Sequence, residues 1–316
     1  MPTISVVIPV YNSEKSLPIL ISKLAEELPL FCENYEIILV NDGSEDTSWK
    51  VISKLSEEYN FVIGINLMRN YGQHNALLCG IRNAQSEYIV TMDDDLQHPP
   101  EEIRKLYKEI EKGFDVVYAE PAKMPHSAWR NFSSWLIKRT LAFVMGIKTV
   151  KNISSFRIFK SRLRKSFSQY KNPGIIIDVL LSWGTTKFSH IEVNEIPREF
   201  GKSNYDFWKL LNQVFLILTG YSTIPLRLAT FIGFFFTAFG FAIFIYVVII
   251  YFGYGSLPGF PFLASIISIF SGTQLFSLGI IGEYVGRVFN RSIDRPPYVI
   301  DLKTNSQQFS TSKDNQ

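Results

Sequence analysis

Three adjacent acids form the strongest chemical signal in the chain. Asp93, Asp94 and Asp95 directly follow a predicted buried strand at residues 88–92. In an extended backbone alternate side chains share a face, so we expect Asp93 and Asp95 to converge on one cation while Asp94 points elsewhere. Carboxylate oxygens are suitable ligands for Mg²⁺ or Mn²⁺. Because the protein would supply only a few ligands, the coordination shell of the metal keeps room for a diphosphate. The alternative is a solvated acidic loop that caps the following helix.

A second acid, Asp42, stands in the turn Asn41-Asp42-Gly43-Ser44 after another predicted strand. Taken alone, such a turn is commonplace and structural. Pro9 and Tyr11 end the first predicted strand in the same manner. Because ligands bind at the carboxyl ends of strands in an α/β sheet, these neighbouring strand ends could enclose a nucleotide.

The elements that must position these residues follow a β-α-β pattern. Short β-branched runs alternate with helical apolar stripes, such as the one through Leu17, Leu20 and Leu24. The runs are apolar enough to be buried on both faces of a sheet. We therefore expect an α/β, Rossmann-like domain with a mostly parallel sheet. The predicted strands are residues 5–10, 36–40, 61–67, 88–92 and 116–119.

Overall composition limits the classes of partner. The 316 residues carry 32 Lys+Arg against 29 Asp+Glu, a net charge of +3. This near-neutral balance gives no reason to expect nucleic acid as a partner. The only cysteines, Cys32 and Cys79, have apolar neighbours, so we expect buried, reduced thiols, as is typical of a cytoplasmic domain.

Residues 228–282 contain no charged side chain. Glycine and proline cluster at residues 253–261 and divide this stretch into two halves. Each half is long enough to cross a bilayer, which predicts a transmembrane hairpin of two helices, about 228–252 and 259–282. Arginines flank both ends of the hairpin while the connecting turn has none, so the positive-inside rule predicts an inner-membrane, multi-pass protein with its catalytic domain and both termini in the cytoplasm.

Two further segments combine aromatic and basic residues at helical spacing. Residues 205–221 precede the hairpin and are expected to lie at the membrane interface. Residues 127–145 fit either an interfacial helix or a core-facing one. The predicted organisation is a nucleotide-binding domain at 1–204, a juxtamembrane helix at 205–226, the hairpin at 227–284 and a cytoplasmic tail at 285–316, polar and disordered from Lys303.

Several segments together resemble the family 2 inverting glycosyltransferases, in the branch of dolichyl-phosphate mannosyltransferases and bacterial undecaprenyl-phosphate sugar transferases. The acidic run with the following Leu-Gln-His-Pro-Pro is the most specific of them. The resemblance covers nearly the whole chain and implies a GT-A-type fold. Its carriers are residues 8–12, 41–44, 69–73, 92–101, 155–159, 198–205 and 282–287.

The resemblance implies roles for individual residues. Pro9, Tyr11 and Asp42 would contact the nucleoside. Asp93, Asp95 and Gln97 would hold Mg²⁺ or Mn²⁺ and the donor's diphosphate. Arg198 and Lys202 would act at phosphate, so the implied catalytic set is Asp93, Asp95, Arg198 and Lys202. The alternative for the two cations is attraction to anionic lipid beside the membrane.

One departure from the family bears on the chemistry. Relatives usually carry an acid just before the Phe-Arg pair, whereas this chain reads Asn152-Ile153-Ser154-Ser155-Phe156-Arg157. A lipid phosphate is already largely an oxyanion at neutral pH, with a second pKa near ~6, so the reaction can proceed without a dedicated base. Alignment and stabilisation of the leaving group are then the main requirements.

The resemblance implies metal-dependent, inverting transfer of a sugar from a UDP-sugar, such as UDP-glucose, to undecaprenyl or another polyprenyl phosphate at the cytoplasmic membrane face. Expected partners are the nucleotide-sugar, the polyprenyl phosphate and the lipid bilayer. Small residues in the second span would permit packing into a homo-oligomer. One rival is a processive polysaccharide synthase, although its Arg-Trp acceptor pair is absent here. The other is a non-catalytic membrane subunit that binds sugar nucleotides.

Overall fold

The structure is a computed structural model that describes residues 1–121, 153–171, 175–194, 196, 215, 219–254 and 259–304. The chain divides into two compact units. The first comprises Met1–Asp206 together with Arg295–Gln316, and the second is Phe207–Asp294.

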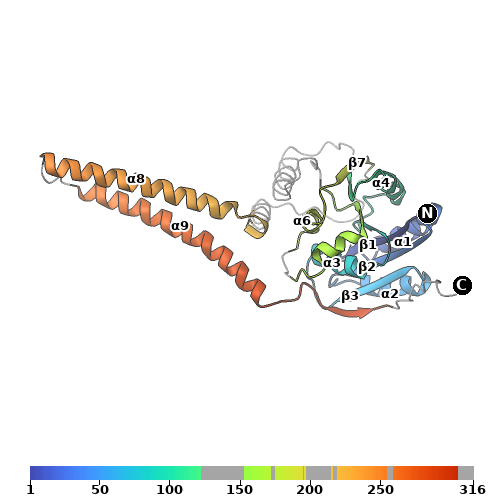
Figure 1. The fold of residues 1–316 in the computed structure, drawn as a ribbon. Helices are drawn as coiled ribbons and strands as arrows, with labels where there is room; N and C mark the ends of the chain where they lie inside the picture. Colours follow the sequence, from blue (N-terminus) through green and yellow to red (C-terminus); the bar gives the residue numbers. More distant parts are fainter. Residues whose placement is uncertain are drawn as a thin grey trace. The chain divides into compact units, whose positions relative to one another are not determined.

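An eight-stranded sheet forms the centre of the first unit, with strand order β7-β5-β6-β4-β1-β2-β3-β8. Strands β1, β2, β3 and β7 are labelled in Figure 1. All five predicted strands are present, and three further strands join them. The strands are β1 (Thr3–Val10), β2 (Asn34–Asn41), β3 (Val62–Leu67), β4 (Tyr88–Thr91), β5 (Val116–Pro121), β6 (Arg157–Lys160), β7 (Phe188–Val193) and β8 (Ile300–Lys303).

The sheet is mostly parallel, as predicted, but two antiparallel strands make it a mixed one. Strands β3, β2, β1 and β4 run parallel to one another, as do β5 and β7. However, β6 lies between β4 and β5 and is antiparallel to both, and β8 is antiparallel to β3. The parallel centre carries the apolar runs that the sequence shows, because helices cover it on both faces.

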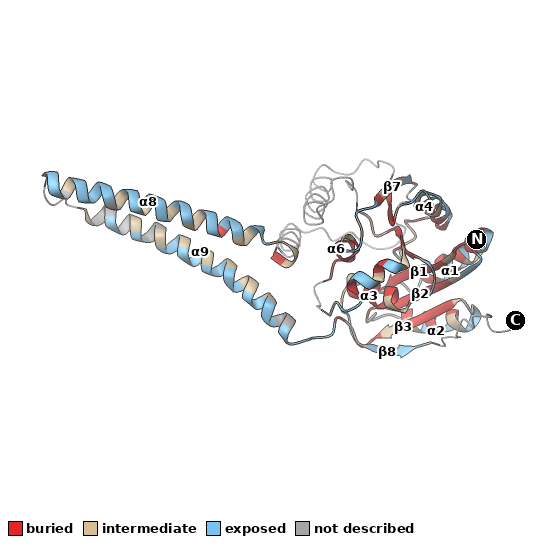
Figure 2. Cartoon of the chain, viewed as in Figure 1, coloured by how far each residue is buried: buried red, intermediate tan, exposed pale blue. Residues whose placement is uncertain are grey.

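Helices cover both faces of the sheet. Apolar side chains of α1 (Ser16–Glu27), α2 (Ser48–Glu58) and α4 (Ile103–Ile110) join one buried cluster with alternate residues of the strands. On the other face, α3 (Gln73–Asn83) packs so closely that a Cβ at Gly80 would lie 2.3 Å from Val7. Figure 2 shows these strands largely buried. The remaining described elements of this unit are α6 (Ile177–Ser182) and the 3₁₀ turns η1 (Leu28–Leu30), η2 (Pro100–Glu102) and η3 (Ser161–Phe167).

Strand β8 lies within the predicted cytoplasmic tail and ends at Lys303, where the predicted disorder begins. Residues 295–304 belong to the first unit, where β8 pairs with β3 and Lys303 is its last residue. The Thr304 hydroxyl accepts a bond from the Gly64 N–H (2.7 Å), and the Thr304 N–H donates to the Gly64 carbonyl (2.9 Å). The polar composition of this segment suits an exposed edge strand. The same composition is typical of a tail, so the sequence alone did not indicate a strand here.

The second unit contains two long helices, α8 (Ile224–Tyr254) and α9 (Phe260–Ser292). They pack against each other through Phe236 and Phe270, whose ring centroids are 6.0 Å apart. A Cβ at Gly240 would lie 2.7 Å from the Phe270 ring, so this glycine permits the close approach. Near the other ends, the Tyr284 hydroxyl donates to the Ser222 carbonyl (2.6 Å).

Among the described residues, one helix is long and apolar enough to cross a membrane, over Ile224–Ile250 of α8. Its large apolar side chains are exposed, Phe234 for instance by 75%, as suits contact with lipid. The crossing of a membrane by α9, and thus the two-span hairpin, stays a prediction. Residues 127–145, expected to form either an interfacial or a core-facing helix, lie outside the described residues, as does most of the predicted interfacial helix at 205–226. Cys32 and Cys79 are buried free thiols, as predicted.

Candidate active site

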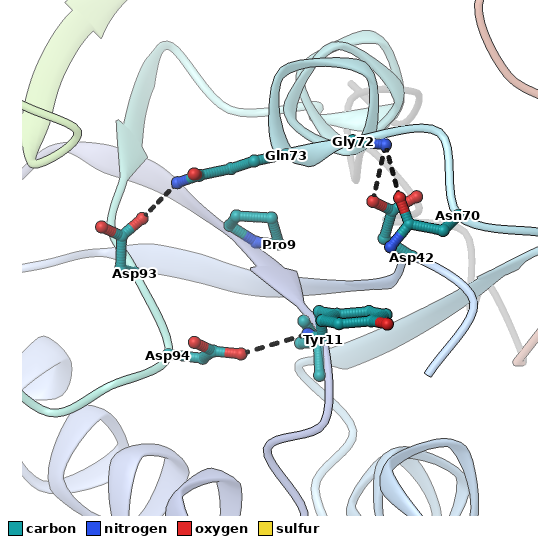
Figure 3. A pocket seen from close by; sticks show the side chains of 9 residues that line it. Pro9, Tyr11, Asp42, Asn70, Gly72, Gln73, Asp93 and Asp94 are labelled. Carbon is teal, nitrogen blue, oxygen red and sulfur yellow. Dashed lines mark hydrogen bonds between the residues drawn. The ribbon is translucent and has the colours of Figure 1, made fainter. Parts of the chain in front are cut away.

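A cavity of about 370 Å³ opens at the carboxyl ends of β1, β2 and β4 (Figure 3). This is the edge of the sheet at which the sequence places a ligand. Tyr11 lines this cavity, and its side chain is 47% exposed. The lining residues are Pro9, Val10, Tyr11, Asp42, Asn70, Gly72, Gln73, Asp93 and Asp94.

The Asp93 carboxylate is held by side chains on both of its oxygens. Gln73, the first residue of α3, donates from Nε2 to Oδ1 (2.7 Å). The Ser155 hydroxyl donates to Oδ2 (2.7 Å). A carboxylate oxygen has two acceptor sites, so each oxygen keeps capacity for a ligand in the cavity.

The acids do not alternate as the extended backbone would require. Strand β4 ends at Thr91, and the chain bends through residues 94–96, with Leu96 at φ 62°. The prediction that Asp94 points away from the ligand is therefore wrong: Asp94 lines the cavity and accepts a bond from the Tyr11 N–H (3.3 Å). Asp95 does not line the cavity, and its Oδ1 accepts from the Gln97 N–H (3.2 Å).

Asp42 is buried and holds the loop that precedes α3. Its Oδ1 accepts from the Tyr71 N–H (2.7 Å) and its Oδ2 from the Gly72 N–H (2.8 Å). Gly72 stands at the N-terminus of α3 with φ 92°, a conformation that a glycine adopts without strain. Asp42 thus belongs to the cavity wall, and both of its oxygens serve the fold of that wall.

Burial raises the carboxyl pKa values at the site. It raises the pKa of Asp42, and the hydrogen bonds from the Tyr71 and Gly72 N–H groups partly oppose this rise. It raises the pKa of Asp94 to about 6, and Asp93 and Asp95 add to that rise. Burial also raises the pKa of Asp93, opposed by the Ser155 hydroxyl and reinforced by the charge of Asp95. The three neighbouring acids therefore repel one another, and a cation between them would relieve that repulsion.

The structure brings together Pro9, Tyr11, Asp42 and Asp93 of the predicted site residues. Gln97 lies beside Asp95, and its carbonyl accepts from the Ile196 N–H (3.0 Å). Arg198 and Lys202 lie outside the described residues. In the described part of the chain, no group of three or more His, Cys, Asp and Glu could hold a metal ion. An ion here would thus need ligands from the substrate as well as from the protein.

Three residues gain a place at the site that sequence reasoning did not assign. Gln73 and Ser155 hold Asp93, and Asn70 lines the cavity and accepts from the Gly72 N–H (3.1 Å). All three belong to the segments on which the family resemblance depends. Their place in these segments was the signal in the sequence that could have identified them, because nothing in their local spacing indicates contact with Asp93.

The model of the glycosyl transferase family 2 matches residues 5–170. The undecaprenyl-phosphate 4-deoxy-4-formamido-L-arabinose transferase of Photorhabdus laumondii is 35% identical over 314 residues, which cover 96% of this chain and 97% of the relative. The transferase of the same description from Proteus mirabilis is also 35% identical, covering 94% of this chain and 92% of the relative. The chain therefore belongs to glycosyl transferase family 2, and it is a glycosyltransferase.

A solved structure supports the fold. Glucosyl-3-phosphoglycerate synthase from Mycobacterium tuberculosis, crystallised with Mn²⁺, UDP and phosphoglyceric acid, matches with a TM-score of 0.51 at 16% identity. The match covers 69% of this chain and 76% of that chain. The first unit thus has a GT-A-like α/β fold with a mixed sheet.

Proposed function

We propose that this glycosyltransferase moves a sugar from a UDP-sugar to undecaprenyl or another polyprenyl phosphate, with inversion at the anomeric carbon. The observation that carries the proposal is the cavity at the strand ends, where Asp93 and Asp94 face Tyr11 and Pro9. The names of the relatives support a polyprenyl-phosphate acceptor, and they favour a 4-deoxy-4-formamido-L-arabinosyl group over glucose as the sugar.

The donor set fits a divalent cation. Asp93 keeps free acceptor capacity on both oxygens. The charge of Asp95 raises the pKa of Asp93, and a bound cation would lower that pKa again. Asp93 and Asp95 would hold Mg²⁺ or Mn²⁺, with Gln97 beside them, and the donor's diphosphate would complete the shell. When bound, the cation neutralises negative charge on the departing diphosphate.

The chain's own residues do the positioning. The exposed Tyr11 ring offers a face for the base of the donor, and Asp42 keeps the loop of Asn70 and Gly72 in place beside it. An oxygen of the acceptor phosphate forms the bond to the anomeric carbon as the bond from that carbon to UDP breaks. We propose that Arg198 and Lys202 hold the phosphates during this step, since both are cationic residue types at neutral pH.

Attachment to a bilayer suits this acceptor. A long isoprenoid stays in the membrane, so the enzyme must meet its phosphate at the surface, and α8 is apolar and long enough to span the membrane. The proposal puts the chain in the inner membrane, with the catalytic domain and both termini on the cytoplasmic side and α9 as a second span. A homo-oligomer is also proposed, through the small residues of α9.

The test incubates membranes that contain the chain with undecaprenyl phosphate and a panel of radiolabelled UDP-sugars. The panel includes UDP-4-deoxy-4-formamido-L-arabinose and UDP-glucose, each with and without EDTA. We expect label that is extractable into organic solvent for one donor, lost with EDTA and absent from Asp93→Asn membranes. A polymeric product would instead indicate a processive synthase, and label that does not follow undecaprenyl phosphate would contradict the proposed acceptor.

A further inference from the structure

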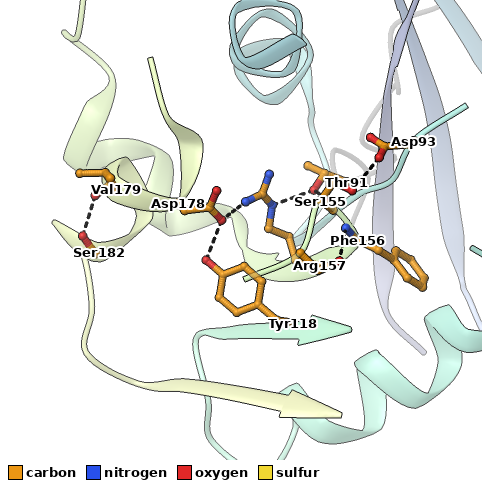
Figure 4. Close-up of polar contacts among 10 residues, drawn as sticks. Thr91, Asp93, Tyr118, Ser155, Phe156, Arg157, Asp178, Val179 and Ser182 are labelled. Carbon is orange, nitrogen blue, oxygen red and sulfur yellow. Dashed lines mark hydrogen bonds and ion pairs between the residues drawn. The ribbon is translucent and has the colours of Figure 1, made fainter. Parts of the chain in front are cut away.

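A fully buried ion pair lies next to the candidate site (Figure 4). Arg157 on β6 and Asp178 in the first turn of α6 are 1% and 4% exposed, and they form a hydrogen-bonded salt bridge. The Tyr118 hydroxyl donates to the same carboxylate oxygen (2.9 Å). Buried charges are costly unless they are paired and hydrogen-bonded, and both charges here have such partners.

The guanidinium also reaches β4. Arg157 Nε donates to Thr91 Oγ1 (2.9 Å), and Thr91 Oγ1 lies 2.7 Å from the Ser155 carbonyl oxygen. A guanidinium can only donate and a carbonyl can only accept, so the Thr91 proton must point to Ser155. Thr91 is fully buried and stands opposite Arg157 in the β4-β6 register. The Thr91 hydroxyl can therefore only accept from Arg157 and donate to Ser155.

Ser155 completes a connection to Asp93. Its carbonyl accepts from Thr91, and its own hydroxyl donates to Asp93 Oδ2 (2.7 Å). The buried guanidinium is thus connected to the carboxylate by hydrogen bonds to Thr91 and Ser155 and by the covalent structure of Ser155 between its carbonyl and its hydroxyl. Gln73 holds the other carboxylate oxygen, so the plane of the Asp93 carboxylate is set from two sides.

We propose that Thr91 and Ser155 are positioning residues for Asp93, with buried Arg157 holding the Thr91 hydroxyl, and that together they orient the Asp93 carboxylate toward a divalent cation. The inference rests on the proposed function, because it takes Asp93 as a metal ligand. Partners that orient metal ligands typically change metal affinity about 10- to 100-fold when they are removed. A purely structural ion pair would change stability and leave the metal response intact.

The experiment measures UDP binding by isothermal titration calorimetry on the full-length chain in nanodiscs, once with Mn²⁺ and once with EDTA. The ratio of the two affinities reports how well the cation is held. We expect Ser155→Ala and Thr91→Val to lower this ratio about tenfold. Thr91→Ser, which keeps the hydroxyl, should restore it. Thermal unfolding of each variant without metal reports any general loss of stability.

Two controls separate the possible failures. Tyr118→Phe removes a bond to Asp178 outside the connection to Asp93, so it should lower the unfolding temperature and leave the ratio unchanged. Asp93→Asn should abolish the effect of Mn²⁺. If Asp93→Asn abolishes it while Thr91→Val and Ser155→Ala keep the ratio of the unmodified chain, the inference is overturned and the proposed function stands. If Asp93→Asn itself keeps the ratio, the proposed metal site fails, and the inference fails with it.

Discussion

Asp42 comes directly after β2, and Asp93 comes shortly after β4 of the same sheet. Both line the same cavity, yet they are held in different ways. Asp42 receives its two bonds from backbone N–H groups, those of Tyr71 and Gly72. Asp93 receives its two bonds from side chains, Gln73 and Ser155. Burial raises the pKa of both carboxyls.

The difference separates a residue that shapes the site from a residue that acts in it. Backbone donors hold Asp42 only while the 70–72 loop keeps its conformation, so Asp42 and the loop depend on each other for stability. Side-chain donors leave Asp93 with acceptor capacity toward the cavity, and its orientation can be altered without unfolding the loop. Mutations at the two positions should therefore change different measured quantities.

The largest effect is expected for Asp93→Asn. The amide removes a negative charge that would hold the cation, so we expect transfer to undecaprenyl phosphate to fall by about 10³-fold, equivalent to about 4 kcal/mol in the transition state. The free energy of unfolding without metal should change by less than about 1 kcal/mol, because the Ser155 hydroxyl and the Gln73 amide can turn to match the new amide, which the backbone donors of Asp42 cannot do. If the Asp93→Asn enzyme kept its activity, the claim that Asp93 acts in the reaction while Asp42 only shapes the site would be contradicted.

Gly43→Ala tests the loop side of the comparison. Gly43 has φ +65°, and a Cβ there would lie 2.4 Å from the backbone nitrogen of Asn70. Backbone strain and displacement of the loop should together lower the free energy of unfolding by about 2–4 kcal/mol. Urea unfolding of both proteins measures the difference.

Gly113 supplies a matched control for Gly43→Ala. It also has a positive φ, +105°, but a Cβ there would meet nothing within 4 Å. Gly113→Ala should therefore lose only the strain, about 1–2 kcal/mol, and leave UDP binding unchanged. Equal losses at the two glycines would show that the approach to Asn70 does not matter.

Asp42→Asn should act mainly on stability. The amide keeps one acceptor oxygen but turns an NH₂ group toward a backbone N–H, leaving a buried donor without a partner. We expect the free energy of unfolding to fall by about 1–3 kcal/mol. The ratio of UDP affinities with Mn²⁺ and with EDTA should stay at the value of the unmodified chain. A collapse of that ratio would place Asp42 in the metal site as well.

The smallest effect concerns pH and Asp94, whose pKa is raised to about 6 by burial. An unfolded Asp titrates near ~3.9, so between these values the folded state binds more protons than the unfolded state. This carboxyl therefore costs stability above its folded pKa, and the cost is relieved as the pH falls through about 6. Compared with Asp94→Asn, the unmodified chain should gain about 1 kcal/mol between about pH 7.5 and pH 5. Parallel pH profiles of the two proteins would contradict the raised pKa.

The sequence predicted the parallel centre of the sheet and the meeting of Pro9, Tyr11, Asp42 and Asp93. Both follow from local pattern, because apolar β-branched runs identify central strands and parallel strands bring their carboxyl ends to one edge. Strands β6, β7 and β8 were missed, and the reason is clear for β6 and β8. Each has only four residues, half of them charged in the sequences Arg-Ile-Phe-Lys and Ile-Asp-Leu-Lys, and each takes its place by antiparallel pairing with a strand far away in the chain.

The details of the acidic run could not be predicted for a related reason. The alternation of Asp93 and Asp95 assumes that the strand continues, whereas Leu96 adopts a positive φ and turns the chain. The partners of Asp93 come from residues 20 and 62 positions away, Gln73 and Ser155. Periodicity within a segment carries no information about contacts between segments, so only the folded chain reveals them.

A structure of the full-length chain with UDP and Mg²⁺ bound is the most direct test of the central claim. The account predicts the diphosphate in the cavity beside Tyr11 and a cation coordinated by oxygens of both Asp93 and the diphosphate, at about 2.1 Å. A diphosphate bound at another place, or an Asp93 carboxylate that contacts only Gln73 and Ser155 while UDP and cation are bound, would contradict it.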